Sequence, residues 1–172
     1  MTRVSVIGNA GGGKSTMCEK LGKAKGLPVY ALDQLQWNRG WVPTPSHIFK
    51  QKHDEILVKE KWIIDGFASW ETIECRFEKA DTIIFIDHPL WVHYWWASKR
   101  QFMSIFRPRP KFPSGCPMLP MTKQLFKMIW HIHKEIRPRL ISLIEKYENE
   151  GRSVIHIKSP QELNAFINEY TL

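Results

Sequence analysis

The sequence predicts an α/β protein in which a five-stranded parallel sheet lies between two layers of helices. Three observations support this fold class: five short apolar runs rich in Val and Ile, helical patterns between them, and a glycine-rich loop after the first run. The runs are continuous rather than alternating, as in strands that are covered on both faces. Strands that alternate with helices are joined by right-handed crossovers, which build a parallel sheet.

Length and composition place these elements in one domain. A chain of 172 residues lies near the common domain size, and its 43% hydrophobic and 24% charged content is ordinary for a globular protein. We therefore expect a single domain over residues 1–172. The expected strands are Val4–Ile7, Val29–Leu32, Trp62–Ile64, Thr82–Ile86 and Val154–Ile157.

The loop after the first strand carries the strongest functional signal. It fits the pattern G-x-x-x-x-G-K-[ST], the phosphate-binding loop (P-loop) of proteins that use ATP or GTP. Glycines let backbone N–H groups turn toward an anion, and the helix expected over residues 14–24 adds its positive N-terminal end. Lys14 is then expected to reach the β- and γ-phosphates, and Ser15 to ligate Mg²⁺. The expected ATP-binding residues are Gly8, Asn9, Ala10, Gly11, Gly12, Gly13, Lys14, Ser15 and Thr16.

The second strand is followed by a segment with the features of an inserted, mobile element, residues 33–46. It leads into a helix expected over residues 47–61 with Ser46 as its N-cap. Trp37 and Trp41 flank a glycine here, and they either stack on a base or sugar or pack within the protein. Trp62, Trp91 and Trp130 are expected to pack in the core or at an interface.

Three of the five expected strands end at an aspartate: Asp33, Asp65 and Asp87. The carboxyl ends of parallel strands meet at one edge of a sheet, so we expect all three to face one cleft. Mg-nucleotide chemistry requires a carboxylate for the metal or its waters, and Asp65 and Asp87 both fit that role. Asp33 is better placed to face a second substrate. An aspartate at a strand end is also a common helix or turn cap, so the sequence leaves open which of the three serves the metal.

The positive charge of the chain is concentrated in residues 88–134. This segment holds no Asp or Glu and eight Lys or Arg residues, which equals the formal net charge of +8. It includes five prolines between residues 107 and 120, so that part is neither regular helix nor central strand. We expect residues 99–136 to form a basic lid over the active site; a surface loop packed by Phe112 and Met118 is the alternative. A positive field of this kind attracts ATP or a phosphorylated substrate, with nucleic acid as the alternative.

The remaining elements have clear local signals. A third helix is expected over residues 70–79, and a long helical stretch over residues 91–147. After the last strand, Ser159-Pro160-Gln161-Glu162 reads as a capping box with Pro at the first helical position. Three widely spaced cysteines without a zinc pattern indicate reduced thiols. Since no stretch resembles a membrane span or a secretory leader, we expect a cytoplasmic protein without a membrane partner, either monomer or dimer.

At these residues the chain resembles the P-loop small-molecule kinases related to adenylate, shikimate and gluconate kinases. Gly8–Thr16 matches their phosphate loop, and Asp65-Gly66-Phe67 is similar to the Asp-Gly-Phe after the third strand of adenylate kinases. Tyr30–Asp33 resembles the strand end whose aspartate faces the acceptor hydroxyl in shikimate and gluconate kinases. Over nearly its whole length the chain is similar to bacterial adenylate-kinase-like proteins that bear the name topology modulation protein. Segments that carry this similarity are Leu32–Trp37, Trp62–Phe67, Gly115–Pro117, Ile129–Trp130 and Arg137–Arg139.

The resemblance implies strand order 2-3-1-4-5, an acceptor-binding segment over residues 33–61, and a lid after the fourth strand. The residues it implies for acceptor binding are Asp33, Trp37, Trp41, Gly66 and Phe67. The arginines that match those closing on the phosphates are Arg100, Arg107 and Arg109 in the lid and Arg137 and Arg139 after it. The resulting catalytic set is Lys14, Asp33, Arg100, Arg107 and Arg137, with Ser15 and Asp65 as metal ligands. Ala68-Ser69 stands where adenylate kinases continue with Pro-Arg, which weakens the case for AMP as acceptor.

The expected function is therefore phosphoryl transfer from Mg-ATP to a small metabolite or nucleotide, with ATP and Mg²⁺ as cofactors. Two alternatives belong to other classes: a nucleotide-regulated nucleic-acid-binding protein that modulates DNA topology, and an NTPase switch. The sequence contains no helix-turn-helix, zinc finger or RNA-binding motif, and no Asn-Lys-x-Asp sequence that would specify guanine. It does not identify the acceptor.

Overall fold

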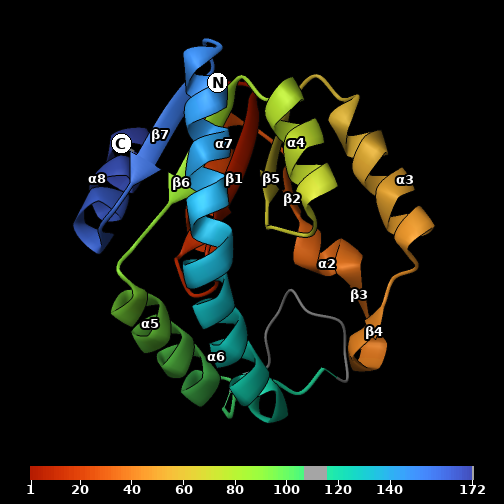
Figure 1. Ribbon diagram of the computed structural model, residues 1–172, viewed down its shortest axis with the longest axis vertical. Coiled ribbons are helices and arrows are strands. Elements are labelled where there is room, and N and C mark those ends of the chain that lie inside the picture. Colours follow the sequence, from red (N-terminus) through yellow and green to blue (C-terminus); the bar gives the residue numbers. More distant parts are fainter. Residues whose placement is uncertain (107–115, 172) are drawn as a thin grey trace.

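The main sheet has five parallel strands, as the sequence predicts. The computed structural model describes residues 1–106 and 116–171. The strands are β1 (Arg3–Gly8), β2 (Val29–Ala31), β5 (Trp62–Asp65), β6 (Thr82–Ile86) and β7 (Ser153–Ile157), in the order β2-β5-β1-β6-β7 (Figure 1). Counted among these five strands alone, the order is 2-3-1-4-5. The labels differ because two short strands that the sequence did not predict, β3 (Trp37–Asn38) and β4 (Val42–Pro43), form a separate antiparallel pair.

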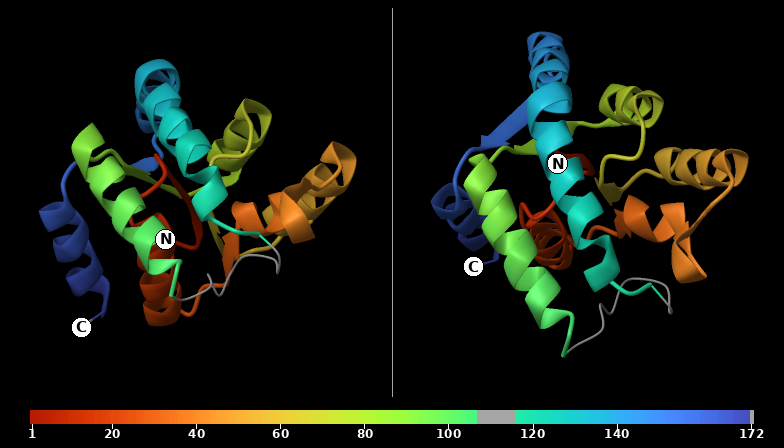
Figure 2. Two further views of the ribbon diagram at one scale, coloured as in Figure 1. Left: turned by 90° about the horizontal axis from the view of Figure 1, so that it is seen from below. Right: turned by 60° about the horizontal axis from the view of Figure 1, so that its bottom comes forward.

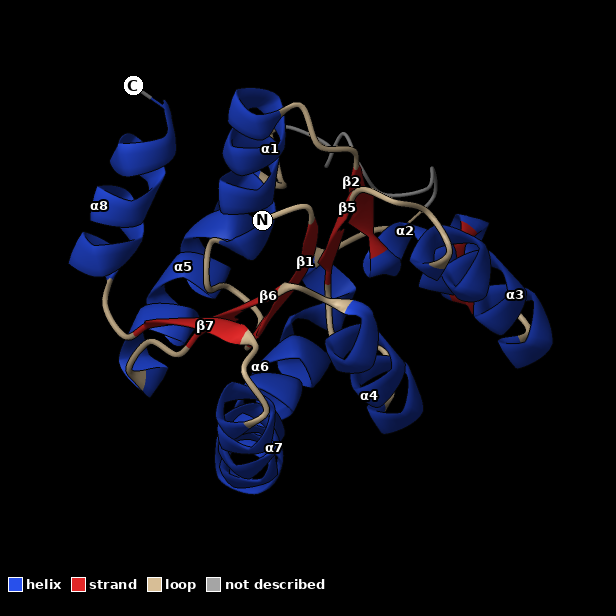
Figure 3. Ribbon diagram, turned by 90° about the horizontal axis from the view of Figure 1, so that it is seen from above, coloured by secondary structure: helices blue, strands red, loops and turns tan. Residues whose placement is uncertain are grey.

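Helices cover both faces of this sheet. On one side lie α1 (Lys14–Lys25) and α8 (Pro160–Thr171), and on the other α4 (Trp70–Lys79) and α7 (Arg137–Asn149), as Figure 3 shows from above. Successive strand residues point to opposite faces, so Ile63 packs into the core with α1 and α8, whereas Ile64 packs into the core with α4 and α7. The three-layer α/β fold is thereby confirmed.

A pair of helices extends beyond the sheet where β1 and β6 end. It consists of α5 (Leu90–Met103) and α6 (Thr122–His131), preceded by the 3₁₀ turn η2 (Leu119–Met121). A π-helical turn, η3 (Ile132–Ile136), joins α6 to α7. In Figure 2, α2 (Leu32–Gln36) and α3 (Ser46–Leu57), in orange, lie on the opposite side of α6 from α5.

Local signals predicted some helix ends correctly and others incorrectly. At α8, the Glu162 amide donates to Ser159 Oγ at 3.1 Å, which confirms Ser159 as the cap. In contrast, Ser46 is the first residue of α3 rather than its N-cap, which is Pro45. The same helix ends at Leu57, not Lys61, because the chain must extend before β5 so that the Trp62 amide can donate to the Thr2 carbonyl.

Two of the tryptophans expected in the core or at an interface are exposed. Trp62 is fully buried, but 67% of Trp91 and 49% of Trp130 are exposed. Both lie on α5 or α6, where the helix pair leaves an outer face uncovered by the sheet. No helix in residues 1–106 or 116–171 is long and apolar enough to cross a bilayer.

Candidate functional site

A large cleft opens at the carboxyl ends of the strands. Its volume is about 800 Å³, and it is lined by the P-loop, the segment after β2, the loop after β5, and the helix pair α5–α6. The predicted site residues that line it are Gly8, Ala10, Gly11, Gly12, Gly13, Lys14, Ser15, Thr16, Asp33, Trp37, Trp41, Asp65, Gly66, Phe67 and Arg100.

The P-loop conformation explains its glycines. Gly8 has φ +149°, and a Cβ there would lie 2.2 Å from the Ile86 carbonyl oxygen. At Gly11, with φ +71°, a Cβ would lie 2.7 Å from the His93 carbonyl oxygen. Side chains are therefore excluded both by backbone conformation and by close packing against β6 and α5. Across the loop, Lys14 Nζ donates to the Asn9 carbonyl at 2.7 Å, which holds the ammonium group at the loop.

A buried histidine supports the P-loop from α5. His93 Nδ1 lies 3.0 Å from the Ala10 carbonyl oxygen, and the residue is 1% exposed. Burial, with the nearby charge of Lys14, lowers the pKa of His93 to about 4. The ring is therefore neutral at pH 7, and the contact requires that Nδ1 carries the proton and donates it. We did not predict this residue, since its role depends on a contact 83 residues away in the sequence.

Ser15 and Asp65 come together as the sequence predicts. Ser15 Oγ donates to Asp65 Oδ2 at 2.6 Å. Asp65 is 5% exposed, and its Oδ1 is buried with no partner among the described residues. Burial raises the pKa of Asp65, while Lys14 and the Ser15 hydroxyl act against that rise.

This pair fits Mg²⁺. It offers a hydroxyl oxygen and a carboxylate beside the phosphate loop, and the orphaned Oδ1 is an open oxygen ligand. No group of three or more His, Cys, Asp or Glu suited to a metal occurs in the described part of the chain. That agrees with a magnesium ion held by few protein groups and completed by phosphate and water oxygens.

The segment after β2 forms a second wall of the cleft. Asp33 lies on α2 and lines the cleft. Trp37 and Trp41 contact each other edge to face, with ring centroids 5.6 Å apart. The Trp41 indole donates to the Pro117 carbonyl at 3.1 Å, and its amide donates to Cys116 Sγ at 3.3 Å. The β3–β4 pair is thus held against the chain that leads into η2.

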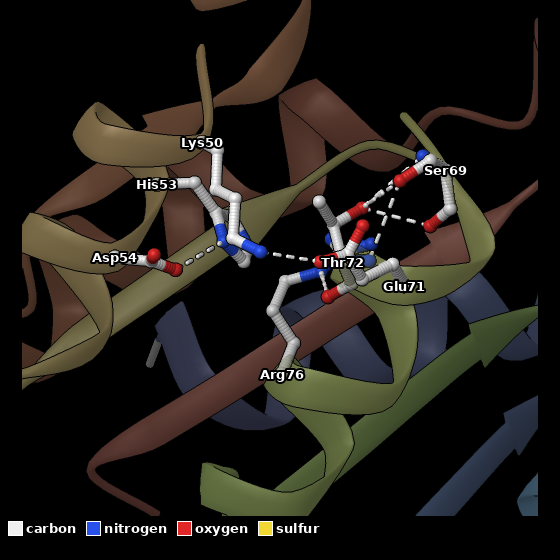
Figure 4. Close-up of polar contacts among 7 residues, drawn as sticks. All are labelled: Lys50, His53, Asp54, Ser69, Glu71, Thr72 and Arg76. Carbon is white, nitrogen blue, oxygen red and sulfur yellow. Dashed lines mark hydrogen bonds and ion pairs between the residues drawn. The ribbon is translucent and has the colours of Figure 1, made fainter. Parts of the chain in front are cut away.

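The loop after β5 is held by a buried arginine. Arg76 is fully buried on α4 and donates to the carbonyls of Gly66 at 2.8 Å and Phe67 at 3.0 Å. Its Nε donates to the Thr72 carbonyl at 3.0 Å. Figure 4 shows Arg76 and Thr72 among the polar residues that join α3 to α4. The sequence signal for such a role is weak: a cation on the apolar face of α4, between Ile73 and Phe77.

Among the described residues, one of the arginines predicted to bind the phosphates lines the cleft. Arg100 lines the cleft, and burial lowers the pKa of its guanidinium while Asp33 acts to raise it. Arg107 and Arg109 lie outside the described residues. Arg139 Cζ lies 4.5 Å from the centre of the Trp70 ring.

One expectation about the strand-end aspartates is wrong. Asp87 does not line the large cleft with Asp33 and Asp65. Instead it accepts two hydrogen bonds from Arg137, at 2.6 and 2.8 Å, and lies 3.0 Å from His156 Nε2. The neighbouring strand β7 and helix α7 supply these partners, so Asp87 turns toward them. The structure therefore brings neither Arg137 nor Arg139 into the lining of the cleft.

Comparisons with known proteins agree with this fold. No protein-family model matches the sequence, and no curated protein matches it. Among solved structures, the chain is similar to a shikimate kinase from Acinetobacter baumannii in complex with shikimate, with 12% identity, a TM-score of 0.55, and coverage of 98% of this chain and 90% of that chain. It is also similar to a gluconokinase from Sinorhizobium meliloti 1021, with 15% identity, a TM-score of 0.53, and coverage of 99% and 89%.

A third similar structure is shikimate kinase from Aquifex aeolicus, with 18% identity, a TM-score of 0.50, and coverage of 97% of this chain and 92% of that chain. The structural neighbours are thus P-loop small-molecule kinases. At these identities the likeness establishes the fold alone, which is that of a P-loop kinase.

Proposed function

We propose that this protein transfers the γ-phosphoryl group of Mg-ATP to a small metabolite or nucleotide. The observation that carries the proposal is the hydrogen bond from Ser15 to the buried carboxylate of Asp65, beside a glycine loop that shares its cleft with Asp33. The fold of sugar-acid and shikimate kinases supports the same class of reaction.

In this proposal the chain positions groups and balances charge, which is most of what phosphoryl transfer requires. Loop amides and Lys14 bind the phosphates, and Ser15 and Asp65 hold Mg²⁺. Bound Mg²⁺ supplies positive charge to the phosphate oxygens. Arg100 offers planar donors to the transferring group from the opposite wall. Arg107, Arg109, Arg137 and Arg139 remain proposed phosphate ligands; for Arg137 that role requires release from Asp87.

Asp33 acts on the acceptor in this scheme. If the acceptor is a hydroxyl compound, Asp33 orients the hydroxyl or takes its proton. If it is a nucleoside monophosphate, the attacking phosphate is already ionised and requires no base. The strand-end position of Asp33 on the acceptor wall supports the hydroxyl case.

The test is ADP release from Mg-ATP, with and without nucleoside monophosphates, nucleosides, sugars, polyols and short DNA. We expect release that depends on one acceptor class, a loss of 100-fold or more in Lys14→Ala, and normal release in Lys23→Ala, whose residue is exposed on α1 and outside the cleft lining. For a hydroxyl acceptor, Asp33→Asn should lower kcat at least 100-fold. Near-normal turnover of Asp33→Asn would exclude the base role.

One observation favours a second candidate, a nucleic-acid-linked NTPase. The acid-free segment places exposed Lys123 and Lys127 four residues apart on α6, and Lys134 Nζ lies 5.2 Å from the centre of the Trp130 ring. Basic and aromatic groups of this kind bind single-stranded nucleic acid. ADP release stimulated by DNA alone would favour that candidate, and slow release indifferent to every addition would favour an NTPase switch.

A further inference from the structure

The acceptor half of the cleft has two apolar walls. On the side of η2, α6 and η3 the lining is mostly apolar, with Gln124 and His131 as its polar members; the apolar residues are Met118, Met121, Leu125, Met128, Ile132 and Ile136. Aromatic rings face the cleft from the other segments, namely Trp37, Trp41 and Phe67. Aromatic rings and the adaptable thioethers of methionine both make favourable contacts with a flat ring. This lining suits a ring-bearing molecule better than an open-chain polyol.

A buried carboxamide without a partner among the described residues belongs to the α5 part of the cleft lining. Gln101, on α5, lines the cleft and is 3% exposed. Both its Oε1 and its Nε2 are buried and make no hydrogen bond within the described part of the chain. Buried polar groups are rarely left unpaired, because each loses its hydrogen bonds to water. A ligand that offers an adjacent donor and acceptor satisfies both atoms of this amide, as the edge of a nucleobase does.

Within the described part of the chain, the charges that line the cleft favour an acceptor that is close to neutral. Its charged side chains, among described residues, are Lys14, Asp33, Asp65 and Arg100, with His131 as a further titratable group. Lys14 and Asp65 belong to the phosphate and metal site. Arg100 and Asp33 both line the cleft, and Asp33 acts to raise the pKa of Arg100, so the charges of these two described residues offset each other. An anionic acceptor would be repelled by the carboxylate of Asp33.

We propose that the acceptor is an uncharged compound with a flat ring and a hydroxyl group, of the nucleoside type. This inference rests on the proposed kinase function. The ring lies between the aromatic and methionine walls, its polar edge pairs with Gln101, and its hydroxyl lies at Asp33. In the transfer step the hydroxyl oxygen bonds to the γ-phosphorus, and the bond from that phosphorus to the β–γ bridging oxygen breaks. The hydroxyl proton passes to Asp33, and ADP leaves.

The experiment is calorimetric binding, with and without saturating Mg²⁺ and a non-hydrolysable ATP analogue. Adenosine, guanosine, cytidine and thymidine are compared with their 5′-monophosphates, and with shikimate and gluconate. We expect at least one nucleoside to bind tenfold or more tightly than its monophosphate and than either hydroxy acid. Tighter binding of a monophosphate or hydroxy acid, or no binding of any nucleoside under either condition, would overturn the proposal.

Matched variants test Gln101 itself. Gln101→Leu keeps the side-chain size and removes an amide that has no partner among the described residues. It is expected to weaken nucleoside binding tenfold or more without changing the affinity for the ATP analogue. Gln161→Leu, at an exposed position on α8 outside the cleft lining, is the control and should change neither affinity. An unchanged nucleoside affinity in Gln101→Leu with a wild-type melting temperature would contradict the assignment. If Gln101→Leu does not fold, Gln101→Glu replaces it, because this variant loses the amide donor but keeps the side-chain shape. Its affinities for the nucleoside and for the ATP analogue are compared in the same way.

ADP release separates this proposal from the function on which it rests. A nucleoside that binds but is not phosphorylated would contradict the kinase function and leave the ligand class intact. Acceptor-dependent ADP release with anionic acceptors alone would support the kinase and overturn the ligand class.

Discussion

Arg76 is the buried residue whose role is best defined by its contacts. It has no exposed surface, and its three hydrogen bonds go to backbone carbonyls rather than to a carboxylate. Two of them, those of Gly66 and Phe67, belong to the loop after β5, in which Gly66 has φ +129° and Ala68 has φ +58°. For Ala68 this left-handed conformation is unfavourable and requires support from its surroundings. Arg76 therefore fixes the loop that presents Asp65, Gly66 and Phe67 to the cleft.

Replacement of Arg76 should destabilise the protein. Arg76→Leu leaves the Gly66 and Phe67 carbonyls buried without a donor, so we expect a loss of about 3 kcal/mol in the free energy of unfolding. Arg76→Lys should recover less than half, because one ammonium group cannot span three carbonyls. Urea denaturation measures both. Lys79→Met, at the exposed end of α4, is the control and should change stability by less than about 0.5 kcal/mol.

His93 gives a prediction for pH. Its pKa is about 4 in the folded protein, below the ordinary value of about 6.5 in the unfolded chain. Between these values the unfolded state binds a proton that the folded state does not, so stability falls as pH falls. Above pH 6.5 the lowered pKa of His93 does not reduce the free energy of unfolding. At pH 5 it should reduce that free energy by about 2 kcal/mol.

The comparison of wild type with His93→Gln isolates this contribution, because burial also lowers the pKa of His53 and His88 in both proteins. We expect the variant to lose about 2 kcal/mol less than wild type when urea denaturation is moved from pH 7 to pH 5. Equal losses would show that His93 is not held neutral in the fold.

At the scale of elements, the P-loop is joined directly to α6. Asn9 Nδ2 donates to the Ile129 carbonyl at 2.8 Å, and Asn9 Oδ1 accepts from the Ala10 amide at 2.8 Å. The π-helical turn η3 begins three residues after Ile129. Such turns are frequent at functional sites. One side chain thus connects the phosphate loop to the helix that forms the methionine wall.

Loss of this connection should weaken nucleotide binding. Asn9→Ala removes the donor to Ile129 and the acceptor that orients the Ala10 amide, so we expect about 1 to 2 kcal/mol lower stability and about tenfold weaker Mg-ATP binding. Calorimetry with the non-hydrolysable analogue measures the affinity. Asn164→Ala, at an exposed position on α8, should leave it unchanged. An unaltered affinity in Asn9→Ala would mean that the loop holds its shape without α6.

Elements with local signals were the ones that sequence reasoning predicted. The five strands, α1 and α4 follow from apolar runs, capping residues and the glycine loop, all of which lie within a few residues. The β3–β4 pair was not predicted, because two-residue strands are too short to show an alternation of apolar and polar residues. The π-helical turn η3 was not predicted either, because a single turn of five residues within a longer helix is too short to show a different apolar spacing.

The same distinction between local signals and distant contacts applies to the residues of the candidate site. The P-loop and the Ser15–Asp65 pair were predicted because each belongs to a motif at a strand end. Asp87 was misplaced, because the direction in which a strand-end side chain turns depends on β7 and α7. Arg76, His93 and Gln101 were missed because a buried polar side chain acquires its role from contacts that its own sequence neighbourhood does not encode.

For the molecule as a whole, the cleft joins four segments that are far apart in the chain. The P-loop, the chain after β2, the loop after β5 and the α5–α6 pair each contribute to its lining. A ligand that binds this cleft therefore binds the folded state and not the unfolded chain. At 100 times Kd, such a ligand stabilises the fold by about 2.7 kcal/mol, which for a protein of this size raises Tm by roughly 5–10 °C.

Asp65 makes the stability of the whole protein depend on its ligand. Burial raises the pKa of this carboxyl above its ordinary value, so the ionised group opposes folding at neutral pH when no metal is bound. Asp65→Asn should therefore melt at or above the wild-type Tm in the absence of ligand. Because the amide is a poor magnesium ligand, we expect this variant to lose the part of the ATP-induced Tm rise that depends on Mg²⁺ and to keep the part seen with ATP and EDTA.

Two variants complete this prediction in the same melting experiment. Asp33→Asn, in the same cleft but outside the metal pair, should keep the full Mg²⁺-dependent rise, whereas Lys14→Ala should lose the rise with and without Mg²⁺. A Mg²⁺-dependent rise that survives in Asp65→Asn and disappears in Asp33→Asn would exchange the roles of the two carboxylates. The metal would then lie on the α2 wall, and the base for a hydroxyl acceptor would have to be sought at the end of β5.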